Sequence, residues 1–381
     1  MHLGGAARAL HFLNVLLHGL TAWLASRVAR CWLPNEEWAL ATGLWVLTFP
    51  LVSNAVAWCS AVFDVSATAL VLMCVLTARR YARDRASAFV RVLLVVIGLA
   101  AFLSKETAAV TPLLVGLDAF AVAAVTPTLA IDLLGLSTII GGIGLIRAAG
   151  AFAVGGSILS RYIFQRMLFG SFGALMVPWH DAVVSAHPVV PLSYGLMQVG
   201  LFGLFFVRVT PRRATRIVVC LCLWVVISIA PLLTFFFIGG DLQAARYLYL
   251  ASIAWAAIMV TVIATLETFG TWGRRVGRAV LLTFVLFGVY GARLHQGPWT
   301  AAADLRDAVM QAARNSAMGQ CRSVTISHAP DNVAGAFVFR NGLPEALHRE
   351  LGITATMSDD PKTVRCAFIW DDTAKRFVSV R

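Results

Sequence analysis

Charged residues are scarce in this chain, and lysine is nearly missing from most of it. Charged residues make up 13% of the sequence and hydrophobic residues 59%, whereas a soluble domain carries about 25% charged residues. The mean hydropathy is +0.79. This composition excludes a soluble globular protein for most of the chain and predicts a polytopic membrane protein.

Several signatures of other protein classes are absent from the sequence. It has no Walker phosphate-binding loop, no Rossmann glycine pattern and no zinc-type cysteine spacing. We therefore expect no cofactor and no metal. The net charge of +12 comes almost entirely from arginines near apolar segments, which indicates membrane orientation rather than binding to nucleic acid.

Apolar segments that could cross a bilayer recur about ten times before residue 297. We expect an α-helical polytopic bundle over residues 1–296 and a small extramembrane α+β domain over residues 297–381. The expected spans are 8–30, 38–50, 57–78, 89–104, 107–125, 128–148, 190–208, 215–237, 248–267 and 279–295.

The distribution of basic residues predicts the orientation of this bundle. One set of loops and span ends holds 14 basic residues and the other set holds 7, so the first side is expected to be cytoplasmic. Both termini and the C-terminal domain then lie outside. The alanine- and arginine-rich composition suggests a bacterial inner membrane, with the C-terminal domain in the periplasm.

The C-terminal domain is polar and nearly neutral, with 10 basic and 9 acidic residues. Helices are expected at 301–313 and 344–351, and strands at 321–327, 335–341, 364–370 and 376–380. Its two cysteines, Cys321 and Cys366, each open or lie within a predicted strand, and an oxidising compartment would favour a disulfide between them. The alternative is two buried free thiols. Acceptor recognition or docking is the expected role of this domain.

The pair Lys105 and Glu106 is the most informative local feature. Lys105 is the only lysine in the first 361 residues, and the pair separates two apolar runs. Charges placed at such a membrane turn are expensive and indicate function. The alternative is a helix cap, in which Lys105 reaches the interface and Glu106 starts the next helix.

Other polar residues in the apolar region are weaker candidates. Asp64 either lines the site or makes a polar contact inside the bundle. His11, Asn14 and His18 fall on one helix face that is expected to turn inward, where hydrogen bonding between helices is favoured over metal binding. Asp241 is either a helix N-cap or a sugar ligand.

Four stretches together resemble the GT-C class of polyprenyl-phosphate-sugar glycosyltransferases, most closely its protein O-mannosyltransferase-like branch. They are HFLNVLLHGLTAWLASRVA, FPLVSNAVAWCSAVFDVSATALVLM, AFLSKETAAVTPLL and DLQAARYLYLASIAW. The last two are the more specific motifs, and the resemblance covers about residues 8–295. It implies transfer of a sugar from a polyprenyl-phosphate donor to an acceptor hydroxyl at the outer membrane face.

The resemblance also implies roles for individual residues. Lys105 and Arg246 would bind the donor phosphate, and Arg161 and Arg166 would either join them or anchor an amphipathic stretch to lipid headgroups. We expect Lys105, Glu106, Asp64 and Arg246 to converge on one cavity that opens to the outer face. The acceptor is a glycan, a lipid or a protein, and membrane lipids surround the bundle.

The chain departs from the family pattern at three places. Phe49-Pro50 stands where the family usually has His-Pro, and Ala61-Val62-Phe63 precedes Asp64 where the family has Gly-Arg. No acidic residue occurs before Glu36, although the family places its catalytic acid in a loop after the first span. The chain thus resembles a member that lacks this span and loop, so we expect it to transfer sugar poorly by itself. Glu106 and Asp64 are the remaining candidate catalytic carboxylates.

Three functional classes are compatible with these observations. The favoured one is a lipid-linked sugar transferase or the remnant of one. The second is a non-catalytic membrane subunit that keeps the fold. A flippase or transporter of lipid-linked glycans is disfavoured, because the chain has no paired spans interrupted by glycine or proline.

Overall fold

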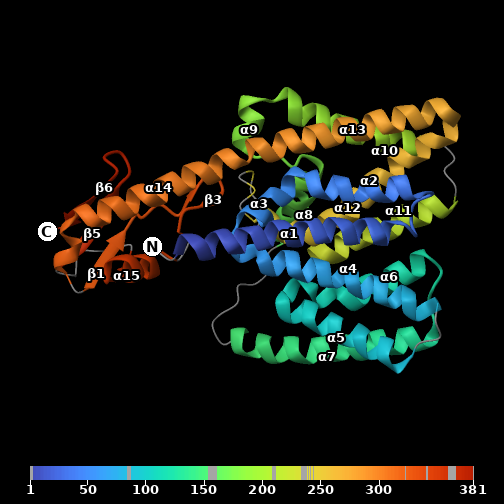
Figure 1. Cartoon of the computed structure of the whole chain (residues 1–381), viewed down its shortest axis with the longest axis horizontal. Coiled ribbons are helices and arrows are strands. Elements are labelled where there is room, and N and C mark those ends of the chain that lie inside the picture. Colours follow the sequence, from blue (N-terminus) through green and yellow to red (C-terminus); the bar gives the residue numbers. More distant parts are fainter. Residues whose placement is uncertain are drawn as a thin grey trace. The chain divides into compact units, whose positions relative to one another are not determined.

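The structure is a computed structural model of the whole chain (Figure 1). It describes residues 3–83, 87–152, 161–207, 212–232, 238, 240, 242, 244–321, 323–339, 342–358 and 366–380. The chain separates into two compact units, Met1–Ala292 and Arg293–Arg381.

The first unit is entirely helical over the elements described. Its α-helices are α1 (Leu3–Ala29), α2 (Glu36–Thr48), α3 (Ser53–Ala57), α4 (Val62–Arg83), α5 (Ala88–Ser104), α6 (Thr111–Ala121), α7 (Pro127–Phe152), α8 (Arg161–Met176), α9 (Asp181–Ala186), α10 (Val189–Val207), α11 (Arg212–Ile229), α12 (Tyr249–Ala264) and α13 (Gly270–Leu294). Short 3-10 helices interrupt them: η1 (Pro50–Val52), η2 (Cys59–Ala61), η3 (Glu106–Val110), η4 (Ala230–Leu232), η5 (Ala245–Leu248) and η6 (Thr265–Phe269).

Within the described residues, five helical segments are long and apolar enough to cross a membrane. A sixth is possible if α2 and the helical segment Pro50–Ala57, which are bent by 47° at a break, form one broken span. The expected span at 38–50 falls on α2 of this bent pair. Two further expected spans coincide with short helices, since α5 has 17 residues and α6 has 11. The count of ten therefore stays a prediction.

Helix α12 forms the centre of the first unit. All of its residues from Tyr249 to Ala264 are buried, and it contacts α2, α4, α10 and α11. A helix that is apolar on every side is buried either by other helices or by lipid, and here other helices surround α12. Figure 1 shows α12 among these neighbours, with α1, α4, α5 and α7 continuing the bundle on one side.

Small residues allow α2 and α13 to approach closely. A Cβ atom at Gly288 of α13 would collide with the backbone oxygen of Thr48, and one at Gly277 would lie 3.2 Å from the Trp38 ring. Close helix approach at glycine is common where van der Waals packing drives association. At one end of this contact, Arg278 donates two hydrogen bonds to Glu37, at 2.6 and 2.8 Å.

The second unit is a small α+β fold. It contains α14 (Gln296–Asn315), η7 (Ala317–Gln320), α15 (Leu343–Leu351) and the strands β1 (Ser323–Ser327), β2 (Asn332–Val333), β3 (Ala336–Phe337), β4 (Thr354–Met357), β5 (Ala367–Asp371) and β6 (Arg376–Val380). The main sheet has the order β4-β1-β5-β6, and β2 pairs with β3 separately. The predicted positions of α15, β1, β5 and β6 are close to those in the structure. The strand predicted at 335–341 is longer than β3, and β4 was not predicted.

The core of this unit lies between the sheet and the two α-helices. Val309 of α14, Leu347 of α15 and Ile326 of β1 are fully buried in it. The β5–β6 hairpin closes with Asp372, which pairs with Lys375 at 2.7 Å. The hydrogen bonds from Lys375 and from Trp370 hold the pKa of Asp372 below its usual range.

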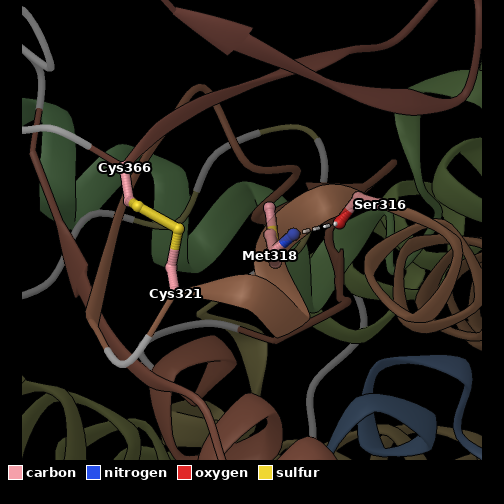
Figure 2. Close-up of a disulfide and its surroundings, with 4 residues drawn as sticks. All are labelled: Ser316, Met318, Cys321 and Cys366. Atoms are coloured by element: carbon pink, nitrogen blue, oxygen red, sulfur yellow. Dashed lines mark hydrogen bonds between the residues drawn. A yellow bond between two sulfur atoms is a disulfide. The ribbon is translucent and has the colours of Figure 1, made fainter.

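A disulfide joins Cys321 to Cys366, with Cα atoms 6.4 Å apart (Figure 2). Strands β1 and β5 are parallel neighbours, and each cysteine precedes one of them. The Thr325 amide donates a hydrogen bond of 2.9 Å to the Cys366 carbonyl. The adjacency of these strands therefore brings the two sulfur atoms together, and Ser316 caps the short helix that precedes Cys321.

Candidate functional site

Charged and aromatic side chains gather where several helices of the first unit begin or end. Arg246 and Tyr247 belong to η5, Asp64 lies in the first turn of α4, Lys105 separates α5 from η3, and Trp58 separates α3 from η2. We call these five residues the Arg246 cluster. They come from segments far apart in the sequence, so only tertiary packing brings them together.

Arg246 and Asp64 form a buried pair at the centre of the cluster. Arg246 Nε lies 3.9 Å from Asp64 Oδ2, and their side chains are 7% and 6% exposed. Each charge needs the other, because an uncompensated charge in a low-dielectric interior is strongly destabilising. Thr68, one turn further along α4, donates a hydrogen bond of 3.0 Å to the Asp64 carbonyl.

Two aromatic rings orient the Arg246 guanidinium. Its Cζ atom lies 3.7 Å from the ring centroid of Trp58 and 4.6 Å from that of Tyr247. Arg246 Nη2 also donates a hydrogen bond of 2.8 Å to the Tyr247 hydroxyl. Stacking and hydrogen bonding fix the planar group, which preorganises it for an anion.

Lys105 extends the positive charge of the cluster. Its ammonium lies 5.2 Å from the ring centroid of Tyr247 and 3.4 Å from Glu106 Oε1. Lys105 and Arg246 thus share one aromatic ring, and both exert a Coulomb attraction on the Asp64 carboxyl group. Lys105 is also the C-cap of α5. Its position as a helix cap is therefore compatible with a role in the site.

The two candidate carboxylates occupy different surroundings. Asp64 is buried beside Arg246, whereas the Glu106 side chain is 64% exposed. Glu106 begins η3, so its carboxylate is the accessible one. In the structure Lys105, Asp64 and Arg246 lie close together. Whether they line one cavity stays a prediction.

Buried asparagines hold the backbone around the cluster. Asn14 of α1 donates a hydrogen bond of 2.9 Å to the Trp58 carbonyl. Asn54 of α3 donates one of 3.2 Å to the carbonyl of Leu242, which precedes η5. Within the described part of the chain, both side-chain oxygens, Asn14 Oδ1 and Asn54 Oδ1, are buried without a hydrogen-bond partner. These amides secure the positions of Trp58 and η5.

The predicted polar face of α1 is only partly buried. Asn14 and His18 are buried, but His11 is exposed, so the expectation that all three turn inward is wrong for His11. His18 Nε2 lies 3.3 Å from the Leu47 carbonyl, which leaves Nδ1 to accept from the Tyr249 hydroxyl at 2.6 Å. Among the described residues, no three His, Cys, Asp or Glu side chains are grouped as metal ligands.

Three predicted site residues lie partly or wholly outside the described part of the structure. Arg161 and Arg166 belong to α8, but their side chains lie outside the described residues. Asp241 is itself outside the described residues.

Sequence reasoning did not assign Trp58 and Tyr247 to the site. Tyr247 directly follows Arg246 in the ARYLYL stretch, and Trp58 lies six residues before Asp64. Tryptophan near a span end is typical of an interfacial belt, so its sequence position alone favours a different interpretation. Contact between these rings and a cation depends on the fold.

Comparison with known proteins gives one partial similarity. The chain is 36% identical over 107 residues to the "Protein O-mannosyl-transferase Tmtc1" of Drosophila melanogaster. The match covers 28% of this chain and 12% of that protein's length. No protein-family model and no solved structure matches the chain. The similarity indicates a glycosyltransferase-like relationship for part of the chain.

Proposed function

We propose that this protein is a membrane glycosyltransferase of the GT-C type, which transfers a sugar from a polyprenyl-phosphate donor to an acceptor hydroxyl. The Arg246 cluster is the observation that carries the proposal. It places two cations beside a buried carboxylate and one shared aromatic ring. The partial similarity to a protein O-mannosyl-transferase supports the same reaction class.

The reaction gives these residues distinct tasks. The acceptor oxygen forms a bond to the anomeric carbon while the bond from that carbon to the phosphate oxygen breaks. The bonding electrons leave with the polyprenyl phosphate, whose negative charge grows. Lys105 and Arg246 stabilise that charge, because fixed positive groups act strongly where water is excluded.

The carboxylates divide the remaining work. Asp64 holds the Arg246 guanidinium in position, which makes it a positioning residue. Glu106 is exposed, so its carboxylate can take the acceptor proton as a general base.

The proposal includes an orientation and a location. About ten spans would place the Arg246 cluster and the C-terminal domain on the outer face of a bacterial inner membrane, with the arginine-rich loops inside. A donor with its phosphate at the outer surface would then reach Lys105 and Arg246 from the bilayer. The acceptor would be a glycan, a lipid or a protein in the cell envelope.

The experiment that tests this function measures donor binding and transfer separately. The purified chain in lipid nanodiscs is incubated with polyprenyl-phosphate hexoses, and both bound donor and released polyprenyl phosphate are quantified. The chain by itself is expected to transfer sugar slowly, and Lys105→Gln should lower that turnover by roughly a further 10²–10³-fold. Lys375→Gln, in the hairpin of the second unit, serves as a control with the same change of side chain.

Two results would count against the proposal. If the wild-type chain neither binds nor turns over any such donor, the assignment to this reaction class is wrong. If it binds the donor through Lys105 but releases no polyprenyl phosphate, the protein is a non-catalytic subunit and not an enzyme.

A further inference from the structure

A cavity of about 680 Å³ lies at the opposite end of α4 from Asp64. Arg79, in its wall, is separated from Asp64 by about 22 Å along the helix at the usual rise per residue. The wall also contains Arg213 and Arg216 of α11 and the turn between α6 and α7. This volume lies within the range of about 300–1,000 Å³ that is typical of ligand pockets.

Arg79 is a fixed part of this wall. Its Nε and Nη2 donate to the two Asp118 oxygens at 2.8 and 2.6 Å, and its Nη1 donates to the Val28 carbonyl at 2.6 Å. Trp32 lies against it, with 5.4 Å between the guanidinium and the ring centroid. Asp118 balances the charge of Arg79. This arginine therefore shapes the cavity wall and offers the N–H groups that Asp118 and Val28 do not use, but it adds little net charge.

Arg213 and Arg216 supply uncompensated positive charge. They are three residues apart on α11 and therefore share a helix face. Arg213 Nη2 donates to the Cys31 carbonyl at 3.0 Å, which holds its side chain at the cavity. No carboxylate pairs with either arginine within the described part of the chain, and no acidic side chain lines the cavity there.

The turn between α6 and α7 adds to the positive potential. Thr126 lines the cavity and caps α7, since its hydroxyl accepts a hydrogen bond of 3.2 Å from the Leu129 amide. The first turn of this 26-residue helix therefore begins at the cavity wall. The positive end of a helix dipole favours an anion there.

A smaller apolar cavity adjoins the same arginine. It has a volume of about 230 Å³, and its wall includes Arg213, Trp32, Leu33 and Ile217. Glu267 also lines it, with its carboxylate paired to Arg274 at 3.2 Å. Arg213 thus lines both a cationic and an apolar cavity. A ligand that combines a phosphate with an apolar chain matches this pair of cavities better than a free ion does.

We propose that the cavity bounded by Arg79, Arg213 and Arg216 binds the phosphate of an anionic lipid, whose chain enters the neighbouring apolar cavity. Arg213 and Arg216 provide charge-assisted hydrogen bonds to the phosphate oxygens. This site lies at the other end of the helices from the Arg246 cluster. It does not depend on the proposed transferase function.

The test uses the purified full chain in detergent with phosphatidic acid as the probe. Native mass spectrometry measures the bound lipid, and the lipid-induced shift in unfolding temperature gives an apparent affinity. The double variant Arg213→Gln/Arg216→Gln is expected to weaken binding at least tenfold. Arg79 is left unchanged, because its loss would unpair Asp118 and disturb folding.

A control variant distinguishes binding in this cavity from general attraction of an anionic lipid to basic residues on the surface. Arg27→Gln/Arg275→Gln removes the same two charges from exposed positions at the same end of the bundle that do not line the cavity. We expect it to leave the affinity within about twofold of wild type. Equal weakening by both double variants would overturn the site, as would unchanged binding in Arg213→Gln/Arg216→Gln.

Two further probes define the ligand. Phosphatidylcholine should bind at least tenfold more weakly than phosphatidic acid, because its headgroup carries no net charge. Inorganic phosphate should compete only at far higher concentration than the lipid. If inorganic phosphate binds as tightly as phosphatidic acid, the assignment to a lipid is wrong and a free phosphate is the ligand.

Discussion

The guanidinium of Arg246 lies over the ring of Trp58, with its Cζ atom 3.7 Å from the ring centroid. Asp64 meets the same guanidinium at 3.9 Å. The arginine is thereby held by a ring and a carboxylate from two other segments. A planar, delocalised cation suits this position, and a lysine ammonium would not reproduce its stacking or its fork of donors.

Replacement of Arg246 by lysine tests the value of that geometry. We expect Arg246→Lys to keep the positive charge but to lower sugar transfer by roughly 10²–10³-fold, because an ammonium loses the stacking on Trp58 and the hydrogen bond to Tyr247 that hold the cation in place. The measurement is release of polyprenyl phosphate by folded protein, checked by size-exclusion chromatography. A variant with wild-type turnover would show that charge alone suffices at this position.

The Arg79–Asp118 pair should be important for stability. The side chains are 8% and 2% exposed, and removal of one partner leaves a buried charge without compensation. We expect Asp118→Ala to lower the free energy of unfolding by about 3–5 kcal/mol. Chemical unfolding of the purified chain in detergent measures this change.

The control for Asp118 is a second arginine–aspartate pair in the same unit. Arg91 and Asp132 are joined at 2.7 Å, but Arg91 is 47% exposed. Solvent screens the Arg91 end of this pair, so Arg91→Ala, which leaves Asp132 with its hydrogen bond from Tyr81, should cost no more than about 1 kcal/mol. Equal losses for the two variants would contradict the burial argument.

The disulfide should stabilise the second unit. Cys321 and Cys366 are separated by 45 residues, and closing a loop of this size is worth about 3–4 kcal/mol in the chain-entropy model. The variant Cys321→Ser/Cys366→Ser should therefore make this unit much more sensitive to limited proteolysis of the intact chain. Cys222→Ser, which removes an exposed free cysteine, should not change that sensitivity.

The orientation of the chain can be tested with reporter fusions. If the arginine-rich loops are cytoplasmic, alkaline phosphatase fused after Arg381 should be active, and the same enzyme fused after Arg83 should be inactive. A fluorescent protein should give the opposite pattern. Fluorescence from the fusion after Arg381 would place the second unit in the cytoplasm and overturn the predicted orientation.

Much of the architecture follows from local sequence. Long apolar runs predict membrane-spanning helices because the backbone must satisfy its own hydrogen bonds in lipid. The change to mixed charge near residue 296 predicts a separate polar unit, and the structure divides the chain at Ala292. Alternation of β-branched and aromatic residues located β1, β5 and β6, whereas the exposed strand β4 has too weak a pattern to be recognised.

The contacts within the Arg246 cluster could be found only from the tertiary structure. Sequence alone singled out Lys105, because a lone lysine between apolar runs is unusual whatever the fold. It could not show that Lys105 and Arg246 both contact the Tyr247 ring, or that Trp58 stacks on the guanidinium. Nor did it indicate that Asp118, 39 residues from Arg79, would neutralise that arginine. Residue composition limits which charges are present, but their partners are decided by which helices pack together.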